Sequence, residues 1–261
     1  MANPEHVKLV KESIEEWNQW RRESPAEAPN LEEASLEGAN LRGAQLQKTD
    51  LQDVQFQKTD LQEAILTDSN LRGANLEEAN LEEANLQGAN LYRANLYRTN
   101  LQGANLTDAN LRGAILTDSN LQGANLKGSD LTDSNLREAN LKGADLKVAN
   151  LQGASLRFAK LQDASLIWTN CREANLSGAN LEGSDLYIAE LQEANLQGAN
   201  LTDANLRGAN FQGVKNLSCN QINSVKSLDK ETKFPDYLEV KITGDNQWTC
   251  KEVEKENDKQ E

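Results

Sequence analysis

Apolar side chains recur at every fifth position through most of the chain. From Leu31 to Phe211, each of the 37 positions spaced by five residues holds Leu, except for Phe56, Cys171 and Phe211. The residue two positions earlier is small, usually Ala, and the residue between the two is usually Asn or Asp. Fifteen of the 16 glycines lie two residues after the central apolar position. The chain therefore repeats a five-residue unit of a small residue, Asn or Asp, Leu, and two polar or glycine positions.

This spacing fits neither a helix nor a strand. Five residues advance an α-helix by roughly 140°, so the leucines would be spread around all of its sides. On a continuous strand they would alternate between the two faces. Each unit must therefore contain a short extended piece, which directs the small residue and Leu inward, followed by a turn that Gly favours. Successive units form coils, and stacked coils bury a shared core that one coil could not form.

The unit resembles the A-(D/N)-L-x-x repeat of the pentapeptide-repeat family over residues 30–214, about 70% of the chain. The resemblance implies an all-β solenoid, a right-handed quadrilateral β-helix with four units, or 20 residues, in each coil. About nine coils would then form a rod roughly 44 Å long at ~4.8 Å per coil. Where other residues replace the usual Asn, Asp or Ser, we expect local loss of a side-chain ladder without a break in the array. These positions are Gln45, Gln55, Ile65, Ile115, Lys160 and Glu190.

The N-terminal flank is expected to cover one end of the solenoid, where unpaired backbone groups would otherwise invite association. Residues 1–29 are predicted to form a helical cap and linker. Asn3 is placed as the N-cap and Pro4 as the first residue of an amphipathic helix over residues 4–22. Its apolar positions are Val7, Val10, Ile14 and Trp17. A helix lying on a membrane surface is disfavoured, because the polar face carries more acid than base.

The C-terminal flank is predicted to contain a second cap and a tail. Residues 215–250 are predicted to cap the other end of the solenoid. Ser218 is a favoured N-cap for a short helix over residues 219–227. Residues 232–237 resemble a segment that often follows pentapeptide arrays, and its aromatic side chains are expected to cover the last coil. Residues 251–261 are charged and almost free of apolar side chains, which predicts a disordered tail.

Composition and charge argue against some classes of partner. Mean hydropathy is −0.71, and no stretch approaches ~18 consecutive apolar residues, so no membrane span is predicted. Residues 1–10 lack the basic and apolar regions of a signal peptide, and a cytoplasmic location is expected. A nucleic-acid backbone or an anionic membrane would repel the net charge of −14. We therefore expect no direct nucleic-acid partner and no membrane partner.

The sequence offers no catalytic residue, no cofactor site and no metal site. His6 is the only histidine and is interpreted as a partly exposed residue of the cap helix. The acidic pairs Glu77/Glu78 and Glu82/Glu83 occupy outward turn positions, without a pocket that would exclude water. We therefore predict that the protein is not an enzyme.

The three cysteines form no metal-binding or redox motif. Cys171 replaces a central Leu and should point inward, where a thiol behaves as a small apolar group. Three thiols cannot all pair within one chain and no CxxC spacing occurs, so the cysteines are interpreted as reduced. A disulfide between Cys219 and Cys250 stays an open alternative.

Positions 20 residues apart stack on one face if the coil is square. Five large apolar side chains then fall in three consecutive coils, on an outer surface otherwise nearly free of them. They are Val148, Ile167, Trp168, Tyr187 and Ile188, called the apolar stripe below. Exposed apolar patches of this kind usually mark an interaction site. Two coverings are left open: a partner, or the protein's own tail with Phe234, Tyr237 and Trp248.

A second surface feature is basic and aromatic, and it runs along the middle coils. Its residues stack on two neighbouring faces. The first face carries Arg72, Tyr92, Arg93 and Arg112, and the second carries Tyr97, Arg98, Arg137 and Arg157. Ordinary solvated residues are the favoured interpretation of this edge.

The favoured function is a non-catalytic scaffold for protein-protein interaction through the outer faces. The sequence does not identify the protein partner, and a homodimer through an outer face or a solenoid end is one option. One alternative is a purely structural or assembly element. The other is a DNA mimic that modulates a DNA-binding enzyme such as a topoisomerase, which the resemblance suggests because some members of the family mimic DNA.

The charge argues against mimicry of DNA over the whole rod. B-DNA about 44 Å long carries roughly 26 charges, whereas residues 30–214 carry a net charge of −10. Residues 30–83, with a net charge of −8, match DNA only over a short length.

Overall fold

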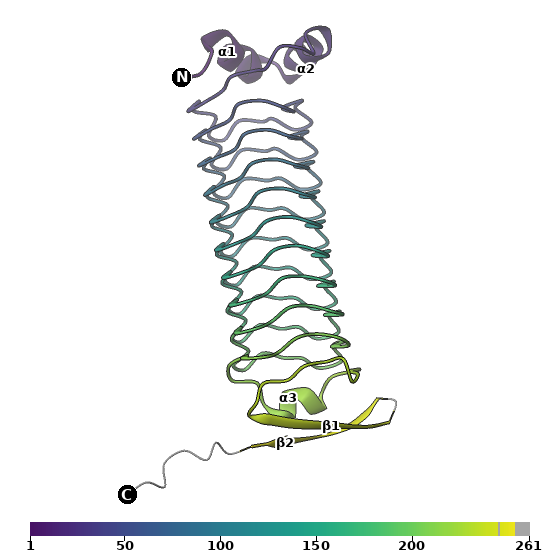
Figure 1. Cartoon of the computed structure of the whole chain (residues 1–261). Coiled ribbons are helices and arrows are strands. Elements are labelled where there is room, and N and C mark those ends of the chain that lie inside the picture. The colour runs from purple at the N-terminus through teal and green to yellow at the C-terminus, as the bar shows by residue number, and fades with distance from the viewer. Residues whose placement is uncertain (245, 254–261) are drawn as a thin grey trace, which may run out of the picture.

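The computed structural model describes residues 1–244 and 246–253, and it shows a long rod closed at both ends (Figure 1). Two helices, α1 (Pro4–Glu12) and α2 (Ile14–Glu23), lie at the N-terminal end. A short helix, α3 (Cys219–Asn223), and an antiparallel hairpin lie at the other end. The hairpin strands are β1 (Leu238–Gly244) and β2 (Gln247–Glu252).

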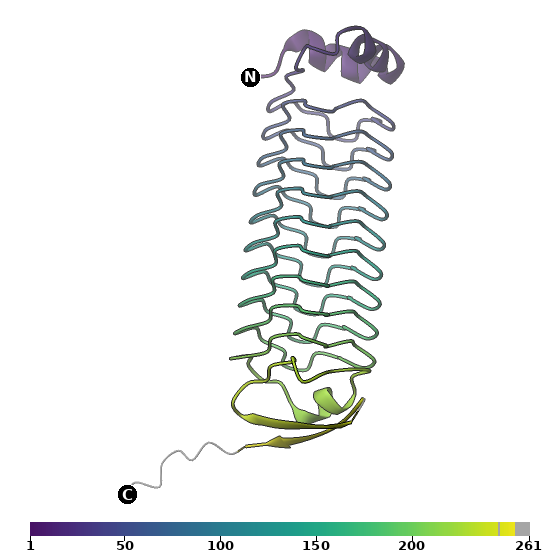
Figure 2. The same cartoon turned by 45° about the vertical axis from the view of Figure 1, so that its right-hand side comes forward.

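The rod between these ends is a stack of coils with a 20-residue register (Figure 2). Single-residue parallel bridges join positions 20 apart, as in Asn100 with Asn120. Within each unit the small residue closes a turn, and the Ala104 N–H donates to the carbonyl oxygen of Leu101 at 3.0 Å. The third residue of each turn has a positive φ, as type II turns require. The turn that the period of five demands is therefore present in every unit.

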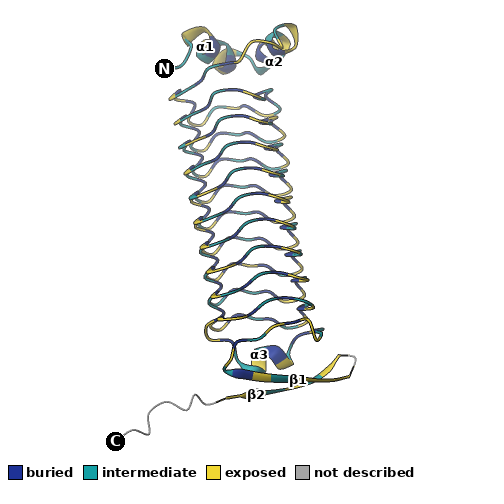
Figure 3. Ribbon diagram, in the orientation of Figure 1, coloured by how far each residue is buried: buried dark blue, intermediate teal, exposed yellow. Residues whose placement is uncertain are grey.

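The central leucines and the small residues fill the inside of the rod. Leu106 and Ala104 are fully buried, and the other central and small residues of the array are buried too, except Ala39 in the first coil, which is partly exposed (Figure 3). Where the small residue is Thr or Ser, its hydroxyl donates to a buried carbonyl oxygen, as Thr99 does to Leu76 at 2.7 Å, except at Thr49, whose buried hydroxyl has no hydrogen-bond partner. At the other Thr and Ser positions the polar atom thus keeps a hydrogen-bond partner inside the core.

Asparagine ladders line the outside of the coils. The Asn120 side-chain amide donates to Oδ1 of Asn100 at 3.0 Å, and Asn140 donates to Asn120 in the same way. The same Oδ1 of Asn100 accepts the backbone N–H of Gln102 at 3.3 Å, which supports the turn. The ladder stops at Lys160, yet the backbone bridge from Lys160 to Asn180 persists. The expected local loss of the ladder without a break is confirmed at this position.

The N-terminal cap consists of two helices, so the prediction of one helix over residues 4–22 was wrong at Ser13. Asn3 does cap α1, and Pro4 is its first residue. Ser13 then adopts an extended conformation that ends α1, and its hydroxyl accepts the N–H of Glu16 as the N-cap of α2. Serine competes for backbone hydrogen bonds in this way, which favours a break over a continuous helix.

The first coil has no coil before it, so some of its backbone carbonyl oxygens lack the usual N–H donor. Side chains of α2 donate hydrogen bonds to these oxygens instead. The fully buried Trp17 donates its indole N–H to the carbonyl oxygen of Gln45 at 3.0 Å. Arg21 donates to the carbonyl oxygens of Gln47 at 2.8 Å and Glu27 at 2.9 Å. Burial lowers the pKa of the Arg21 guanidinium from its ordinary value. The cap is therefore joined to the array by hydrogen bonds as well as by apolar packing.

His6 is buried, which corrects the expectation of a partly exposed residue. Its side chain packs 4.8 Å from the ring of Trp20, centre to centre, and Nδ1 accepts the N–H of Asn30 at 3.2 Å. Nε2 lies 3.3 Å from a carboxylate oxygen of Glu27. The imidazole thus joins α1 to the start of the array and is a structural part of the cap.

The C-terminal cap begins as an irregular continuation of the coil. Bridges join Asn205 to Ser227 and Asn210 to Lys233, so the register lengthens beyond 20 residues. Phe234 stacks on Phe211, which is the last central residue of the array, with 6.2 Å between ring centres. The expected aromatic cover of the last coil is therefore present.

Two boundaries in this flank differ from the prediction. Ser218 does cap α3 through a capping box with Gln221, but the helix ends at Asn223 instead of residue 227. Lys251 and Glu252 belong to β2, so a disordered segment does not begin at residue 251. The rest of the predicted tail, residues 254–261, lies outside the described residues.

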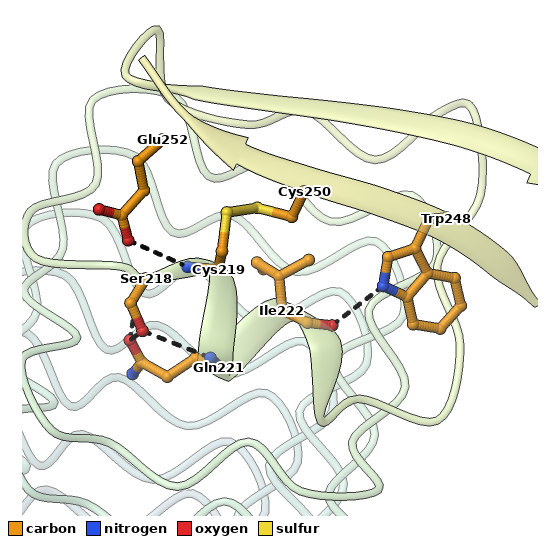
Figure 4. The surroundings of a disulfide bond; sticks show 7 residues. All are labelled: Ser218, Cys219, Gln221, Ile222, Trp248, Cys250 and Glu252. Atoms are coloured by element: carbon orange, nitrogen blue, oxygen red, sulfur yellow. Dashed lines mark hydrogen bonds between the residues drawn. A yellow bond between two sulfur atoms is a disulfide. The ribbon is translucent and has the colours of Figure 1, made fainter. Parts of the chain in front are cut away.

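Cys219 and Cys250 form a disulfide that ties α3 to β2 (Figure 4). The interpretation of these two cysteines as reduced was therefore wrong, and the open alternative holds. Beside the bond, the indole N–H of Trp248 donates to the carbonyl oxygen of Ile222 at 3.2 Å. Disulfides are uncommon in the cytosol. The cytoplasmic location stays a prediction, and this bond weighs against it.

Cys250→Ser is expected to loosen the hairpin without unfolding the coils. The bond closes a loop with a sequence separation of 31, and a loop of this length contributes about 3.7 kcal/mol through the entropy of the unfolded state. Trypsin should cleave at Lys241 and Lys251 at least ten times faster in this variant, and in the parent protein after reduction. Thr249→Ser, at an exposed neighbouring position, serves as the control. If Cys250→Ser and the reduced parent protein resist trypsin as well as Thr249→Ser does, the disulfide does not hold the hairpin in place.

Candidate functional site

The structure brings all five residues of the apolar stripe together on one side of the rod. They occupy the two turn positions that follow Leu146, Leu166 and Leu186 in three consecutive coils. The N–H of Val148 donates to the carbonyl oxygen of Ile167 at 3.0 Å, and the N–H of Trp168 donates to that of Tyr187, also at 3.0 Å. Backbone hydrogen bonds between coils therefore set the spacing of these side chains.

Four of the five side chains are strongly exposed. Trp168 is 59% exposed, Val148 is 56% exposed, and Tyr187 and Ile188 are each 40% exposed. Ile167 is half-buried between them. Large apolar side chains at this level of exposure in adjacent coils form one continuous patch, which is the property expected of a binding surface.

The backbone at the stripe is strained. Val148, Trp168 and Ile188 have φ values of 60°, 60° and 54°, in the left-handed region that favours Gly. This conformation costs roughly 1–2 kcal/mol for an ordinary L-residue, and it is a real outlier for β-branched side chains such as Val and Ile. The exposed side chains recover little of this energy by packing within the rod.

The stripe is also unusual among the turns of the array. Glycine occupies 15 of the positive-φ positions, and 22 other residues occupy the rest. Eighteen of these 22 are Asp, Glu, Lys or Arg. The four apolar exceptions are Val148, Phe158, Trp168 and Ile188. Large apolar residues thus stand where Gly or a solvated charge would suffice, and only within residues 148–188.

The stripe is bounded by glycines at the same turn position. Gly128 precedes Val148 by one coil and Gly208 follows Ile188. A Cβ at Gly208 would lie only 2.9 Å from Cγ1 of Ile188, so this position has no room for a side chain while Ile188 keeps its rotamer. The N–H of Gly208 donates to Oδ1 of Asp229 at 2.9 Å, which joins the end of the stripe to the C-terminal cap.

The tail does not cover the stripe in the part of the chain that the structure describes. Phe234 is stacked on Phe211, and the Tyr237 hydroxyl donates to the carbonyl oxygen of Val214 at 2.9 Å. Burial raises the pKa of Tyr237. Trp248 packs over α3. The alternative in which these three aromatic residues shield the stripe is therefore wrong, since all three are engaged at the end of the rod.

Phe158 is an exposed apolar residue that the sequence interpretation missed. It is 50% exposed, with the Arg157 guanidinium 5.6 Å from the ring centre. It lies ten residues from both Val148 and Trp168, which is half a coil, and so it belongs to a different face. Its ring packs over Gly178, where a Cβ would come within 2.5 Å of ring atoms. The turn position that it shares with Val148 was the signal that could have found it.

The basic and aromatic edge is made of local pairs. The guanidinium of Arg93 lies 5.1 Å from the ring centre of Tyr92, and that of Arg98 lies 4.9 Å from the ring centre of Tyr97. Arg98 also lies 3.9 Å from a carboxylate oxygen of Glu78. These contacts are those of ordinary surface residues, and they add no separate site.

The described residues present little that could support catalysis. Across residues 1–244 and 246–253, no three His, Cys, Asp or Glu side chains are grouped so that they could hold a metal ion. Burial raises the pKa of the Cys171 thiol to about 12, which keeps it protonated and unreactive. None of the helices in that part of the chain is long and apolar enough to span a membrane.

Comparisons with known proteins agree with the repeat. The family model described as pentapeptide repeats matches in eight copies between residues 30 and 218. The chain is similar to HetL, a pentapeptide repeat protein involved in heterocyst differentiation regulation from the cyanobacterium Nostoc sp. strain PCC 7120. The identity is 31%, over 83% of this chain and 93% of HetL, with a TM-score of 0.29. No curated protein matches the chain at a significant level.

Two other solved structures extend the comparison. Rfr23, a pentapeptide repeat protein from the cyanobacterium Cyanothece 51142, is 38% identical over 38% of this chain and 63% of its own, with a TM-score of 0.31. QnrB1, a plasmid-mediated fluoroquinolone resistance protein, is 17% identical over 72% of this chain and 87% of its own, with a TM-score of 0.48. This last similarity is too low to support a conclusion about function.

The fold of this family, a right-handed quadrilateral β-helix, accounts for the turn in each unit, the asparagine ladders and the 20-residue register. The match spans most of the chain, and its boundaries agree with those of the repeat in the sequence. The chain belongs to the pentapeptide-repeat family.

Proposed function

We propose that the protein is a non-catalytic scaffold that binds a protein partner through the apolar stripe. A rod of about nine 20-residue coils, roughly 44 Å long at ~4.8 Å per coil, presents the stripe on coils whose backbone is held by hydrogen bonds. Such a surface changes little on binding and loses little conformational entropy. The observation that supports the proposal most strongly is the placing of Val148, Trp168 and Ile188, exposed and at positive φ, in three adjacent coils.

The positive φ of the stripe residues points to a function because residues with a lower energy cost could occupy the same turn position. Glycine would relieve the backbone, and Asp or Lys would be better solvated. Burial of a few hundred Å² of apolar surface by a partner would return several kcal/mol at about 25 cal/mol per Å², before ordering costs. That gross return is comparable to the backbone cost at the three positions, so binding gives a physical reason for the side chains that the isolated rod does not provide.

The alternatives have less support from the arrangement of charge and chemistry. A DNA mimic needs dense negative charge along the rod, whereas residues 30–214 carry 25 acidic and 15 basic residues. A purely structural element would not need exposed apolar residues in strained turns. The binding role of the stripe therefore has the more specific observation behind it.

The test compares Trp168→Glu with Phe158→Glu. Both positions are exposed, aromatic and at positive φ, but they lie on different faces. Trp168→Glu is expected to weaken every protein contact of the stripe at least 30-fold, since a charge replaces the central apolar contact. Phe158→Glu should leave those contacts unchanged. Sedimentation and affinity capture from the native organism measure the contacts, and circular dichroism confirms that both variants keep their fold. If Trp168→Glu and Phe158→Glu behave alike in both measurements, the stripe is not the binding face.

A further inference from the structure

One of the two columns of the apolar stripe has the same order of residue types in both directions along the rod. The turn column that contains it runs Gly128, Val148, Trp168, Ile188 and Gly208. In either direction from Trp168, the column therefore holds a β-branched residue in the next coil and Gly in the coil after that. A neighbouring outward column repeats this symmetry as Asn125, Asp145, Ser165, Asp185 and Asn205. A surface that matches its own reverse is suited to an isologous contact, in which two copies present the same patch.

We propose that the stripe pairs two copies of this chain side by side, with their rods antiparallel. The proposal rests on the proposed function of the stripe as a docking face, and it names the occupant. A twofold axis at the level of Trp168, perpendicular to both rods, places each column against its own reverse. Val148 then lies against Ile188 of the partner subunit, and Trp168 lies against Trp168 of the partner subunit.

The second column of the stripe favours the antiparallel orientation. In this arrangement Ile167 lies against Ile167 of the partner subunit, and Tyr187 lies over the aliphatic part of Lys147 of the partner subunit. In a parallel pair the twofold axis runs along the rods and reverses the columns sideways, here about the column of Trp168. Ile167 and Tyr187 would then lie over the partner's Asn170 and the partner's Glu190, which are polar. The antiparallel pair therefore gives Ile167 an apolar neighbour and Tyr187 an aliphatic stem, which this parallel pair does not.

The charges around the stripe have a predictable effect on this pairing. Lys147 lies 3.2 Å from Asp145 within one copy. The antiparallel contact places Asp145 on the level of the partner's Asp185, a like-charge pair that Lys147 partly offsets. At the edge of the contact, Lys127 lies opposite Arg207 of the partner subunit, which is a like-charge pair. Each copy carries a net charge of −14. Because these repulsions are screened by salt while the apolar contact is not, association should tighten as ionic strength rises.

The size of the stripe predicts a weak dimer. Stable dimers bury about 800 Å² on each partner. The exposed parts of the five stripe residues amount to on the order of 400 Å², judged from the area of an aromatic side chain. Flanking side chains add to the contact, and the bare positions at Gly128 and Gly208 let neighbouring coils approach. We therefore expect a dissociation constant on the order of 10 μM, as for interfaces at the small end of the range.

Sedimentation of the full chain between about 1 and 200 μM tests the pairing. The parent protein should shift from monomer to dimer over this range, and the shift should move to lower concentration in higher salt. Trp168→Glu should raise the dissociation constant at least 30-fold, while Phe158→Glu should leave it unchanged.

Disulfide trapping tests the orientation of the two copies. Lys127→Cys and Arg207→Cys proteins, mixed and oxidised, should form a mixed crosslinked dimer, while neither should crosslink to itself. In the antiparallel pair, two copies of position 127 are about four coils, or roughly 19 Å, apart along the rod, which is beyond the reach of a disulfide. The native cysteines do not interfere, since Cys171 is buried and Cys219 is bonded to Cys250.

Each outcome decides the proposal. A monomer at 200 μM overturns self-pairing but leaves the stripe as a docking face for another protein, which affinity capture with Trp168→Glu then decides. A dimer that survives Trp168→Glu shows that the copies meet elsewhere and overturns the proposal. Self-crosslinking of Lys127→Cys overturns the antiparallel orientation. Mixed crosslinks together with loss of the dimer in Trp168→Glu establish the proposal.

Discussion

Leu106→Asp is expected to unfold the middle of the array. Leu106 is fully buried in a coil flanked by others of the same kind. Losing a buried Leu side chain costs about 2–5 kcal/mol, and an unpaired carboxylate in its place adds a desolvation penalty of several kcal/mol more. Because each coil is supported only by its neighbours, the defect should spread along the stack. Circular dichroism should show a large loss of the native signal or a fall in Tm of more than about 10 °C.

Two further variants test whether Leu106→Asp acts through its buried position or only through the added charge. Gln102→Asp, at an exposed position in the same coil, should change stability by no more than about 0.5 kcal/mol. Ala104→Trp should destabilise the array, because the column of small residues has no spare volume for an indole. A native spectrum and unchanged melting of Leu106→Asp and Ala104→Trp would contradict the inward placement of these residues.

Deletion of residues 1–24 is expected to produce the second large effect, end-to-end association of the rods. The deletion removes the hydrogen bonds from Trp17 and Arg21 to the carbonyl oxygens of Gln45 and Gln47. It also uncovers the leucines of the first coil. Exposed backbone groups and apolar surface at the end of a solenoid favour growth by stacking. Light scattering at about 100 μM protein should give an apparent mass at least twice that of the full chain.

This deletion is made in the Trp168→Glu background, so that lateral pairing does not contribute to the mass. Trp17→Ala in the same background provides a milder form of the change, with an expected loss of about 3–5 kcal/mol from the cap. Lys8→Ala, at an exposed position of α1, is the control. A truncated protein with the mass and Tm of its parent would show that the helices do not cap the first coil.

The array could be predicted from the sequence because its signal is local. Each unit carries its own inward pair, its own turn and its own outward Asn, and the pattern repeats without a slip. The turns at Gly103 and Asp108 are specified within five residues, so neither needs a distant contact to form. The 20-residue coil came from the family resemblance, and the bridges agree with it.

The caps were harder to predict because their structure depends on contacts between distant residues. Helical periodicity continued through Ser13, but the break there lets Trp17 reach Gln45 across 28 positions of the chain. Burial of His6 follows from the same folding of α1 and α2 over the first coil. The hairpin was also missed, although Leu238, Val240 and Ile242 alternate with polar residues as on a strand with one buried face.

For the candidate site, the sequence by itself determined which residues share a face once the coil length was known. The tertiary structure decided which of these residues are exposed. It showed that Phe234, Tyr237 and Trp248 are engaged elsewhere, and that Val148 and Ile188 occupy a strained backbone. The physical reason is that alignment along a repeat depends only on the period, whereas exposure and strain depend on the packing of the whole chain. Pairing of Cys219 with Cys250 is a result of the same kind, because only the folded cap brings the two sulfur atoms together.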